Sequence, residues 1–259
     1  MPEVYQPTQA DIARLRNDPD QFKVSGDGVF PTLQGEGITT GKPAVFFRLN
    51  FCNLACGFTS GWKCDTWYTW DKTRPEFWKE PEDWPIDYAV AQIESAWSEG
   101  FSGQTGKRLV ITGGEPLMQQ KKIAKLLERM PGWAVEIETN GTIMPIPELS
   151  NCQFNCSPKL DNSGNTRRRR YKPEVLRHIN SLPNSQFKFV VVEPSDMEEI
   201  QGIVDECRLD SVKVLIMPEG QTVDEVDLHA GLVRDEVAKR NWQLTMRSQL
   251  IWFGSKRRT

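Results

Sequence analysis

The chain has 259 residues, a formal net charge of −3 and hydrophobic residues at 38% of its positions. This length accommodates one large α/β domain or two small ones, and the hydrophobic share is ordinary for a globular protein. The small negative charge gives no electrostatic reason to expect a nucleic acid or a membrane surface as a partner. No apolar run approaches the roughly 20 residues of a membrane span.

The cysteine content and the N-terminal residues indicate a compartment. The first 23 residues are polar and lack the apolar core of a secretory signal. Six cysteines that are clustered rather than dispersed fit metal binding in a reducing environment better than a disulfide scaffold. We therefore expect a cytoplasmic protein.

The elements expected along the chain divide it into an extension and one domain. Residues 1–24 are expected to form an N-terminal extension with a short helix at 10–15, and residues 25–259 a single domain. Within that domain, residues 62–84 are crowded with Trp, Pro and charged residues, which indicates a loop or insertion. Apolar patterns predict strands at 43–49, 109–112, 133–138, 153–156, 187–192, 212–216 and 243–246, and helices at 86–100, 120–129, 173–179, 197–207 and 225–240.

The alternation of these strands and helices indicates an α/β fold with mostly parallel strands and helical crossovers. About six central strands are too few for a closed barrel of eight, so we expect a partial (split) TIM-like barrel. The conspicuous motifs of the chain each come directly after a predicted strand. That edge of the sheet is where such a fold places its active site.

Three cysteines in one predicted loop are the strongest indication of chemistry. Cys52, Cys56 and Cys64 can supply three thiolates to a 4Fe–4S cluster and leave its fourth iron open to a ligand. The only two histidines, His178 and His229, fall in predicted helices far along the chain, so no fourth ligand is local. A zinc site or simply buried thiols remain as alternatives at this point.

Further motifs follow in a fixed order: ITGGEP at 111–116, EIETNGT at 136–142 and SPK at 157–159. Together with the cysteines they resemble radical S-adenosylmethionine (SAM) enzymes. The segment LQGEG at 33–37, followed by the strand predicted at 43–49 that carries Arg48, limits the resemblance to one family of these enzymes. From about residue 29 to residue 254 the chain resembles the 7-carboxy-7-deazaguanine synthase family.

This resemblance implies a split barrel, a reaction and a set of cofactors. The expected reaction converts 6-carboxy-5,6,7,8-tetrahydropterin into 7-carboxy-7-deazaguanine, with ring contraction and loss of ammonia. The resemblance implies a 4Fe–4S cluster, SAM and Mg²⁺ as cofactors, with SAM cleaved to a 5′-deoxyadenosyl radical. It further implies a small-molecule pterin substrate, an electron donor such as flavodoxin or ferredoxin, and a homodimer.

The resemblance also implies roles for residues that match the family's motifs. The cluster ligands would be Cys52, Cys56 and Cys64, and Thr66 would coordinate Mg²⁺, which prefers hard oxygen ligands; Asp65 is the rival ligand. Expected SAM-binding residues are Gly114, Ser157, Pro158, Lys159, Met217, Pro218, Glu219 and Gly220. Expected substrate-binding residues are Leu33, Gln34, Gly35, Arg48 and Thr112, with the Arg48 guanidinium suited to gripping the substrate carboxylate.

Two departures and two alternative functions accompany the resemblance. The second cysteine gap spans seven residues, 57–63, and Arg247 and Gln249 stand where the family usually carries Gln and His near the substrate. An activase that makes a glycyl radical on a partner protein would share the cysteines and the GGEP turn. Such an activase gives no reason for residues 34–36 or Arg48. A non-catalytic zinc module with one distant thiol is the other alternative.

Two remaining features are interpreted as structural. Cys152 and Cys156 flank a predicted core strand, where thiols act as small hydrophobic side chains. Four arginines at 167–170 occupy a polar segment and are expected to be a solvated run of charge.

Overall fold

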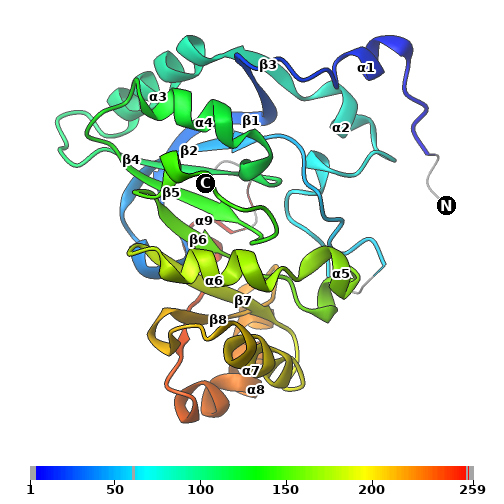
Figure 1. Cartoon of the computed structure of the whole chain (residues 1–259), viewed down its shortest axis with the longest axis vertical. Helices are drawn as coiled ribbons and strands as arrows, with labels where there is room; N and C mark the ends of the chain where they lie inside the picture. Colours follow the sequence, from blue (N-terminus) through cyan, green and yellow to red (C-terminus); the bar gives the residue numbers. More distant parts are fainter. Residues whose placement is uncertain (1–3, 60–61, 255, 257–259) are drawn as a thin grey trace.

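The structure, a computed structural model, describes residues 4–59, 62–254 and 256. A nine-stranded sheet in the order β3-β1-β2-β4-β5-β6-β7-β8-β9 forms its centre (Figure 1). The strands are β1 Gln21–Leu33, β2 Pro43–Leu49, β3 Glu82–Pro85, β4 Arg108–Gly113, β5 Ala134–Thr139, β6 Gln153–Cys156, β7 Ser185–Val191, β8 Val214–Pro218 and β9 Gln243–Leu244. The α-helices are α1 Gln9–Ala13, α2 Pro75–Lys79, α3 Ile86–Gly100, α4 Gln120–Leu127, α5 Arg167–Arg170, α6 Pro173–Ser181, α7 Asp196–Cys207, α8 Val223–Lys239 and α9 Ser248–Phe253.

The sheet is mostly parallel, as the alternation of elements predicts. From β2 through β4, β5, β6, β7 and β8 to β9 every neighbouring pair is parallel, whereas β1 runs antiparallel to both β2 and β3. The sheet is open, with β3 and β9 at its two edges. The fold is therefore mixed α/β around a mostly parallel sheet. Among the described residues, no helix combines the length and apolarity needed to cross a bilayer.

The first strand is the main element that the sequence patterns did not predict. β1 begins at Gln21, inside the segment expected to be an extension, and its residues Phe22 and Val24 are fully buried. Its pairing with β2 shifts register between Val24 and Val29, and Gly28 there has φ +60°. This bulge interrupts the apolar alternation by which a strand is recognised.

The segment expected to be a loop or insertion contains regular structure as well. Residues 62–84 include the 3₁₀-helix Trp67–Thr69, the helix α2 and most of β3. Aromatic packing stabilises this part of the chain: Phe77, which is buried, makes edge-on ring contact with Trp78 and a tilted contact with Phe51, next to the first cysteine. The segment thus packs against the cysteine loop.

The central strands place apolar and polar residues on opposite faces of the sheet, because successive side chains alternate. In β5, Ile137 belongs to the hydrophobic core, whereas Glu136 and Glu138 point to the other face. In β7, Phe187 belongs to the core and Lys188 to the opposite face. The apolar face packs against the helices, and the polar face is left for the functional site.

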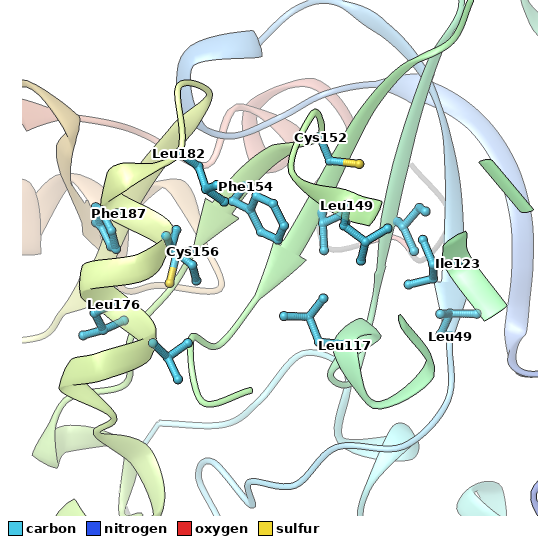
Figure 2. Close-up of a cluster of buried hydrophobic side chains, with 14 of the residues drawn as sticks. Leu49, Leu117, Ile123, Leu149, Cys152, Phe154, Cys156, Leu176, Leu182 and Phe187 are labelled. Carbon is cyan, nitrogen blue, oxygen red and sulfur yellow. The ribbon is translucent and has the colours of Figure 1, made fainter. Parts of the chain in front are cut away.

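The hydrophobic core lies between the sheet and helices that include α3, α4, α6, α7 and α8. Figure 2 shows Phe154 of β6 and Phe187 of β7 beside Leu176 of α6 and the side chain of Leu182. Cys152 and Cys156 are buried in the same core. Their interpretation as small hydrophobic side chains is therefore confirmed.

The interpretation of the four arginines as a solvated run is wrong for the last of them. Residues 167–170 form the short helix α5, and Arg170 is only 4% exposed. Its guanidinium pairs with Glu199, at 2.6 Å, and with Asp161, at 3.1 Å, and also donates to the carbonyl of Asn165. Arg170 therefore anchors the segment that follows β6, a role that composition alone does not reveal.

Truncating Phe154 tests the position of this core. Phe154→Ala is expected to lower the free energy of unfolding by about 3–5 kcal/mol, because it removes a fully buried ring and leaves a cavity. Leu228→Ala, at an exposed position of α8, is the control and should change stability little. Denaturant titrations of both variants measure the difference, and equal effects would contradict this placement of the core.

Candidate active site

A cavity of about 520 Å³ lies at the carboxyl ends of the strands, on the polar face of the sheet. That volume suits a small molecule. The predicted site residues that line it are Leu33, Gln34, Gly35, Arg48, Cys52, Cys56, Cys64, Thr66, Thr112, Gly114, Ser157, Lys159, Met217 and Glu219. Three predicted SAM-binding residues do not line it, although they adjoin residues that do: Pro158, Pro218 and Gly220.

Glu115 of the GGEP turn connects the ends of β4 and β5. Its carboxylate is fully buried and accepts hydrogen bonds from the backbone N–H of Leu117 (3.0 Å), the hydroxyl of Thr139 (2.8 Å) and the backbone N–H of Asn140 (2.7 Å). Its own N–H donates to the carbonyl of Phe51 (2.7 Å). Burial raises the pKa of Glu115. One residue thus joins the GGEP turn, the ETNG turn and the start of the cysteine loop.

The two glycines of this turn are required by the protein's own backbone. A Cβ on Gly113, whose φ is +131°, would lie 1.9 Å from the carbonyl oxygen of Leu49. A Cβ on Gly114 would lie 2.0 Å from the carbonyl oxygen of Phe51. The close approach is therefore between β4 and the segment that leads into the cysteines, and any larger residue would push that segment away.

Asparagine side chains fix the cysteine loop from two sides. Asn53 donates to the hydroxyl of Thr142 (2.7 Å) and accepts from the side chain of Asn140 (2.9 Å), so the ETNG turn holds one side. On the other side, Asn165 accepts from the N–H of Ala55 (3.0 Å), and its amide nitrogen lies 3.3 Å from the sulfur of Cys56. These contacts position the loop without any metal.

The three thiols of the cysteine loop are surrounded by protein, which disfavours their ionised form. Burial raises the pKa of Cys52 to about 12 and that of Cys56 to about 11, and it raises the pKa of Cys64. The thiols therefore stay protonated until a metal displaces the protons. In the described part of the chain, no three His, Cys, Asp or Glu side chains converge to hold one metal ion. All three cysteines line the cavity, where their thiolates could serve as the ligands of a cluster.

Arg48 lies in the cavity wall, but an internal carboxylate already engages it. Its Nε is 3.0 Å from Oδ2 of Asp27, which is 4% exposed, and the Tyr68 hydroxyl donates to the same oxygen. The guanidinium also lies over the ring of Phe30, with 5.7 Å between its central carbon and the ring centroid. Arg48 is therefore oriented by the protein before any substrate arrives.

The two candidate oxygen ligands beside Cys64 have different surroundings. Oδ2 of Asp65 lies 3.0 Å from a guanidinium nitrogen of Arg247. The hydroxyl of Thr66 lies 3.5 Å from the sulfur of Cys64 and 3.4 Å from the carbonyl oxygen of Gly113, inside the cavity wall.

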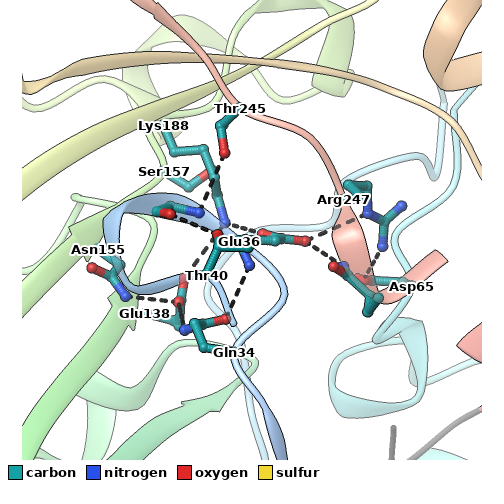
Figure 3. Close-up of polar contacts among 12 residues, drawn as sticks. Gln34, Glu36, Thr40, Asp65, Glu138, Asn155, Ser157, Lys188, Thr245 and Arg247 are labelled. Atoms are coloured by element: carbon teal, nitrogen blue, oxygen red, sulfur yellow. Dashed lines mark hydrogen bonds and ion pairs between the residues drawn. The ribbon is translucent and has the colours of Figure 1, made fainter. Parts of the chain in front are cut away.

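Paired charged side chains form another part of the cavity wall (Figure 3). Lys188 forms ion pairs with Glu36 and, at 3.6 Å, with Glu138. Burial opposes the ionisation of Glu36, but Lys188 and Arg247 outweigh it and hold the pKa of this carboxyl down to about 2. Burial likewise opposes the charge on Lys188, but the two carboxylates outweigh it and raise its pKa. Burial raises the pKa of Glu138.

Sequence reasoning did not assign these charged residues to the site. Lys188 interrupts an apolar run, and Glu136 and Glu138 alternate with apolar residues in the strand predicted at 133–138. A charged side chain at alternate positions of a buried strand indicates a second, polar face, and this signal could have identified them. Asn53 and Asn165 carry no such signal, because their role depends on contacts between distant segments.

Replacing Glu115 tests whether the buried carboxylate holds the loop. Glu115→Gln is expected to lower the free energy of unfolding by about 1–3 kcal/mol, because an amide NH₂ would face one of the N–H donors. Iron content after anaerobic reconstitution should fall with it. Glu128→Gln, at the exposed end of α4, is the matched control. Parent-like stability and iron content in Glu115→Gln would contradict this role.

Comparisons with known proteins place the chain in a family. No protein-family model matches it. A 7-carboxy-7-deazaguanine synthase from Pyrobaculum aerophilum is 31% identical over 88% of this chain and 94% of its own length. A 7-carboxy-7-deazaguanine synthase from Halobacterium salinarum is 31% identical over 90% of this chain and 94% of its own length.

A solved structure agrees with these relatives. The crystal structure of QueE from Escherichia coli superposes with a TM-score of 0.64 at 27% identity, covering 88% of this chain and 94% of that one. Similarity of sequence extends over nearly the whole length of the relatives, and the structural similarity covers the same share of the fold. The chain therefore belongs to the 7-carboxy-7-deazaguanine synthase family.

Proposed function

We propose that the chain converts 6-carboxy-5,6,7,8-tetrahydropterin into 7-carboxy-7-deazaguanine, a radical SAM ring contraction with loss of ammonia in 7-deazapurine biosynthesis. One observation carries this proposal beside the family membership. The cysteine loop, the GGEP turn and the segment Leu33–Gly35 line the same cavity, so a cluster, SAM and a small substrate would meet there.

The donor set fits the cofactors of this family, a 4Fe–4S cluster, SAM and Mg²⁺. Cys52, Cys56 and Cys64 would hold the cluster. When bound, the cluster and SAM supply a one-electron cleavage that makes a radical able to remove hydrogen from the pterin. Around SAM, Gly114, Ser157, Lys159, Met217 and Glu219 would form the wall, while Pro158, Pro218 and Gly220 would hold the backbone of that wall in place.

Thr66 is the proposed Mg²⁺ ligand. Its hydroxyl belongs to the cavity wall, and Mg²⁺ combines one or two protein oxygens with water and substrate oxygens. The rival, Asp65, is paired with Arg247 at 3.0 Å. Coordination by Asp65 would compete with Arg247 for the charge of that carboxylate, which favours Thr66.

The substrate side of the cavity would be formed by Leu33, Gln34, Gly35, Arg48 and Thr112. The pair with Asp27 holds Arg48 through Nε, and its planar guanidinium suits a carboxylate of the pterin. The side-chain NH₂ of Gln34 donates to Glu136, at 3.3 Å, and to Glu138, at 3.4 Å. Side chains that are held in place in this way lower the cost of ordering the site when substrate binds.

We also propose the finer architecture and the partners that the family resemblance implies. The polar face of the open sheet would be the inside of a partial (split) barrel, and residues 25–259 would act as one radical SAM domain behind the extension 1–24. A carrier such as flavodoxin or ferredoxin would donate the electron, in the cytoplasm. A homodimer would cover exposed apolar side chains of α9, which include Ile251 and Trp252.

The two alternative functions fit the cavity less well. A glycyl-radical activase would leave Arg48 and the Leu33–Gly35 segment without a role, yet these residues line the cavity beside the cysteines. A zinc module would likewise leave Arg48 and the Leu33–Gly35 segment without a role.

Anaerobic turnover tests the proposed function. Reconstituted protein incubated with the pterin, SAM, Mg²⁺ and a reductant is expected to form 7-carboxy-7-deazaguanine, detected by mass spectrometry. Omitting SAM or the reductant is the control and should abolish the product. Complete absence of product from protein with a full cluster would refute the proposal.

Replacing Arg48 by lysine tests the substrate assignment. Arg48→Lys keeps the charge but loses the two-pronged donor, so product formation should fall roughly ten- to a hundredfold while uncoupled SAM cleavage survives. Cys64→Ala should abolish both, because it removes a cluster ligand. Arg129→Lys, an exposed arginine paired with Asp87, is the control. Parent-like turnover by Arg48→Lys would rule out the carboxylate clamp.

A further inference from the structure

The C-terminal part of the chain crosses the cavity as a strap, defined here as residues 247–254. The N–H of Ser248 donates to the carbonyl of Gly35 at 3.0 Å, and the side chain of Gln249 donates to Glu36 at 2.7 Å. A Cβ added to Gly35 would lie 2.2 Å from Oε1 of Gln249, so the strap packs directly on the proposed substrate segment. Part of the strap therefore lines the cavity itself.

Arg247, at the start of the strap, joins three walls of the cavity that are far apart in sequence. Its Nε lies 3.5 Å from Oε1 of Glu36, next to the proposed substrate segment. One terminal nitrogen lies 3.0 Å from Oδ2 of Asp65 in the cysteine loop, and the other donates to the carbonyl of Gly220 at 2.8 Å. Figure 3 shows Arg247 between Glu36 and Asp65.

These contacts use the distinctive geometry of the guanidinium. The Arg247 side chain is only 14% exposed, and its nitrogens face two carboxylates and one carbonyl in different directions. A lysine at this position has one charged nitrogen on a flexible stem and could not span the same three groups. Without Arg247, Glu36 would keep Lys188 and Gln249 as partners, and the strap would lose its ion pair with Asp65.

We infer that Arg247 is a positioning residue that fixes the strap across the cavity, orients Glu36 and thereby sets the affinity for the pterin. The inference rests on the proposed function for the identity of the substrate. The position of the strap rests on the contacts alone.

Hydrogen exchange of the apoprotein tests the strap without cluster or substrate. In Arg247→Gln, the amides of residues 248–254 should exchange at least about tenfold faster, because the link that closes the segment is lost. Arg240→Gln is the matched control: this arginine pairs with Glu236 and Glu198 at similar burial and does not line the cavity. Unchanged exchange of the strap in Arg247→Gln would overturn the inference.

Steady-state kinetics of the reconstituted enzyme test the effect on affinity. Both Arg247→Gln and Arg247→Lys should raise KM for the pterin by about tenfold or more, and by more than they raise KM for SAM. Parent-like kinetics in Arg247→Lys would show that charge alone suffices and would overturn the bridging role. If the parent itself forms no product, the proposed function fails, while the exchange experiment still decides whether Arg247 holds the strap.

Discussion

The buried carboxylate of Glu115 is the contact on which the rest of the site depends. It accepts hydrogen bonds at the ends of two neighbouring parallel strands, and its own backbone binds the segment that leads to the first cysteine. A buried carboxylate is tolerated only where donors surround it. Because the donors come from both the GGEP turn and the ETNG turn, the two turns can satisfy the carboxylate only in one relative arrangement.

The second constraint is the two-faced sheet. Its apolar face packs on the helices, and its other face carries Lys188, which pairs with Glu36 from the loop after β1. Glu36 also pairs with Arg247, at the start of the strap. Buried ion pairs add little net stability, although removing one partner costs about 3–5 kcal/mol. Their value here is a wall of fixed charges, already oriented before a polar substrate enters.

Part of this arrangement could be predicted from the sequence. The parallel strands and crossover helices follow from apolar runs separated by helical patterns, and the motifs at the strand ends mark the site. β1 could not be predicted, because the bulge between Val24 and Val29 breaks its pattern. The burial of Arg170 and the partner of Arg48 depend on Glu199 and Asp27, which pair with them only in the folded chain.

The glycines of the GGEP turn illustrate the same limit. From the sequence, Gly114 was expected to bind SAM, where a residue without a Cβ permits close approach. In the structure, the atoms nearest to an added Cβ belong to Leu49 and Phe51. At both positions, the packing behind the motif already excludes a side chain.

The central claim is that one cavity wall holds an iron–sulfur cluster with an open iron beside the substrate segment. Metal analysis and absorption of anaerobically purified protein test it most directly. The account predicts a brown protein with about four irons per chain and a broad absorption near the 400 nm region of iron–sulfur charge transfer. A colourless protein that carries zinc in place of iron would contradict it.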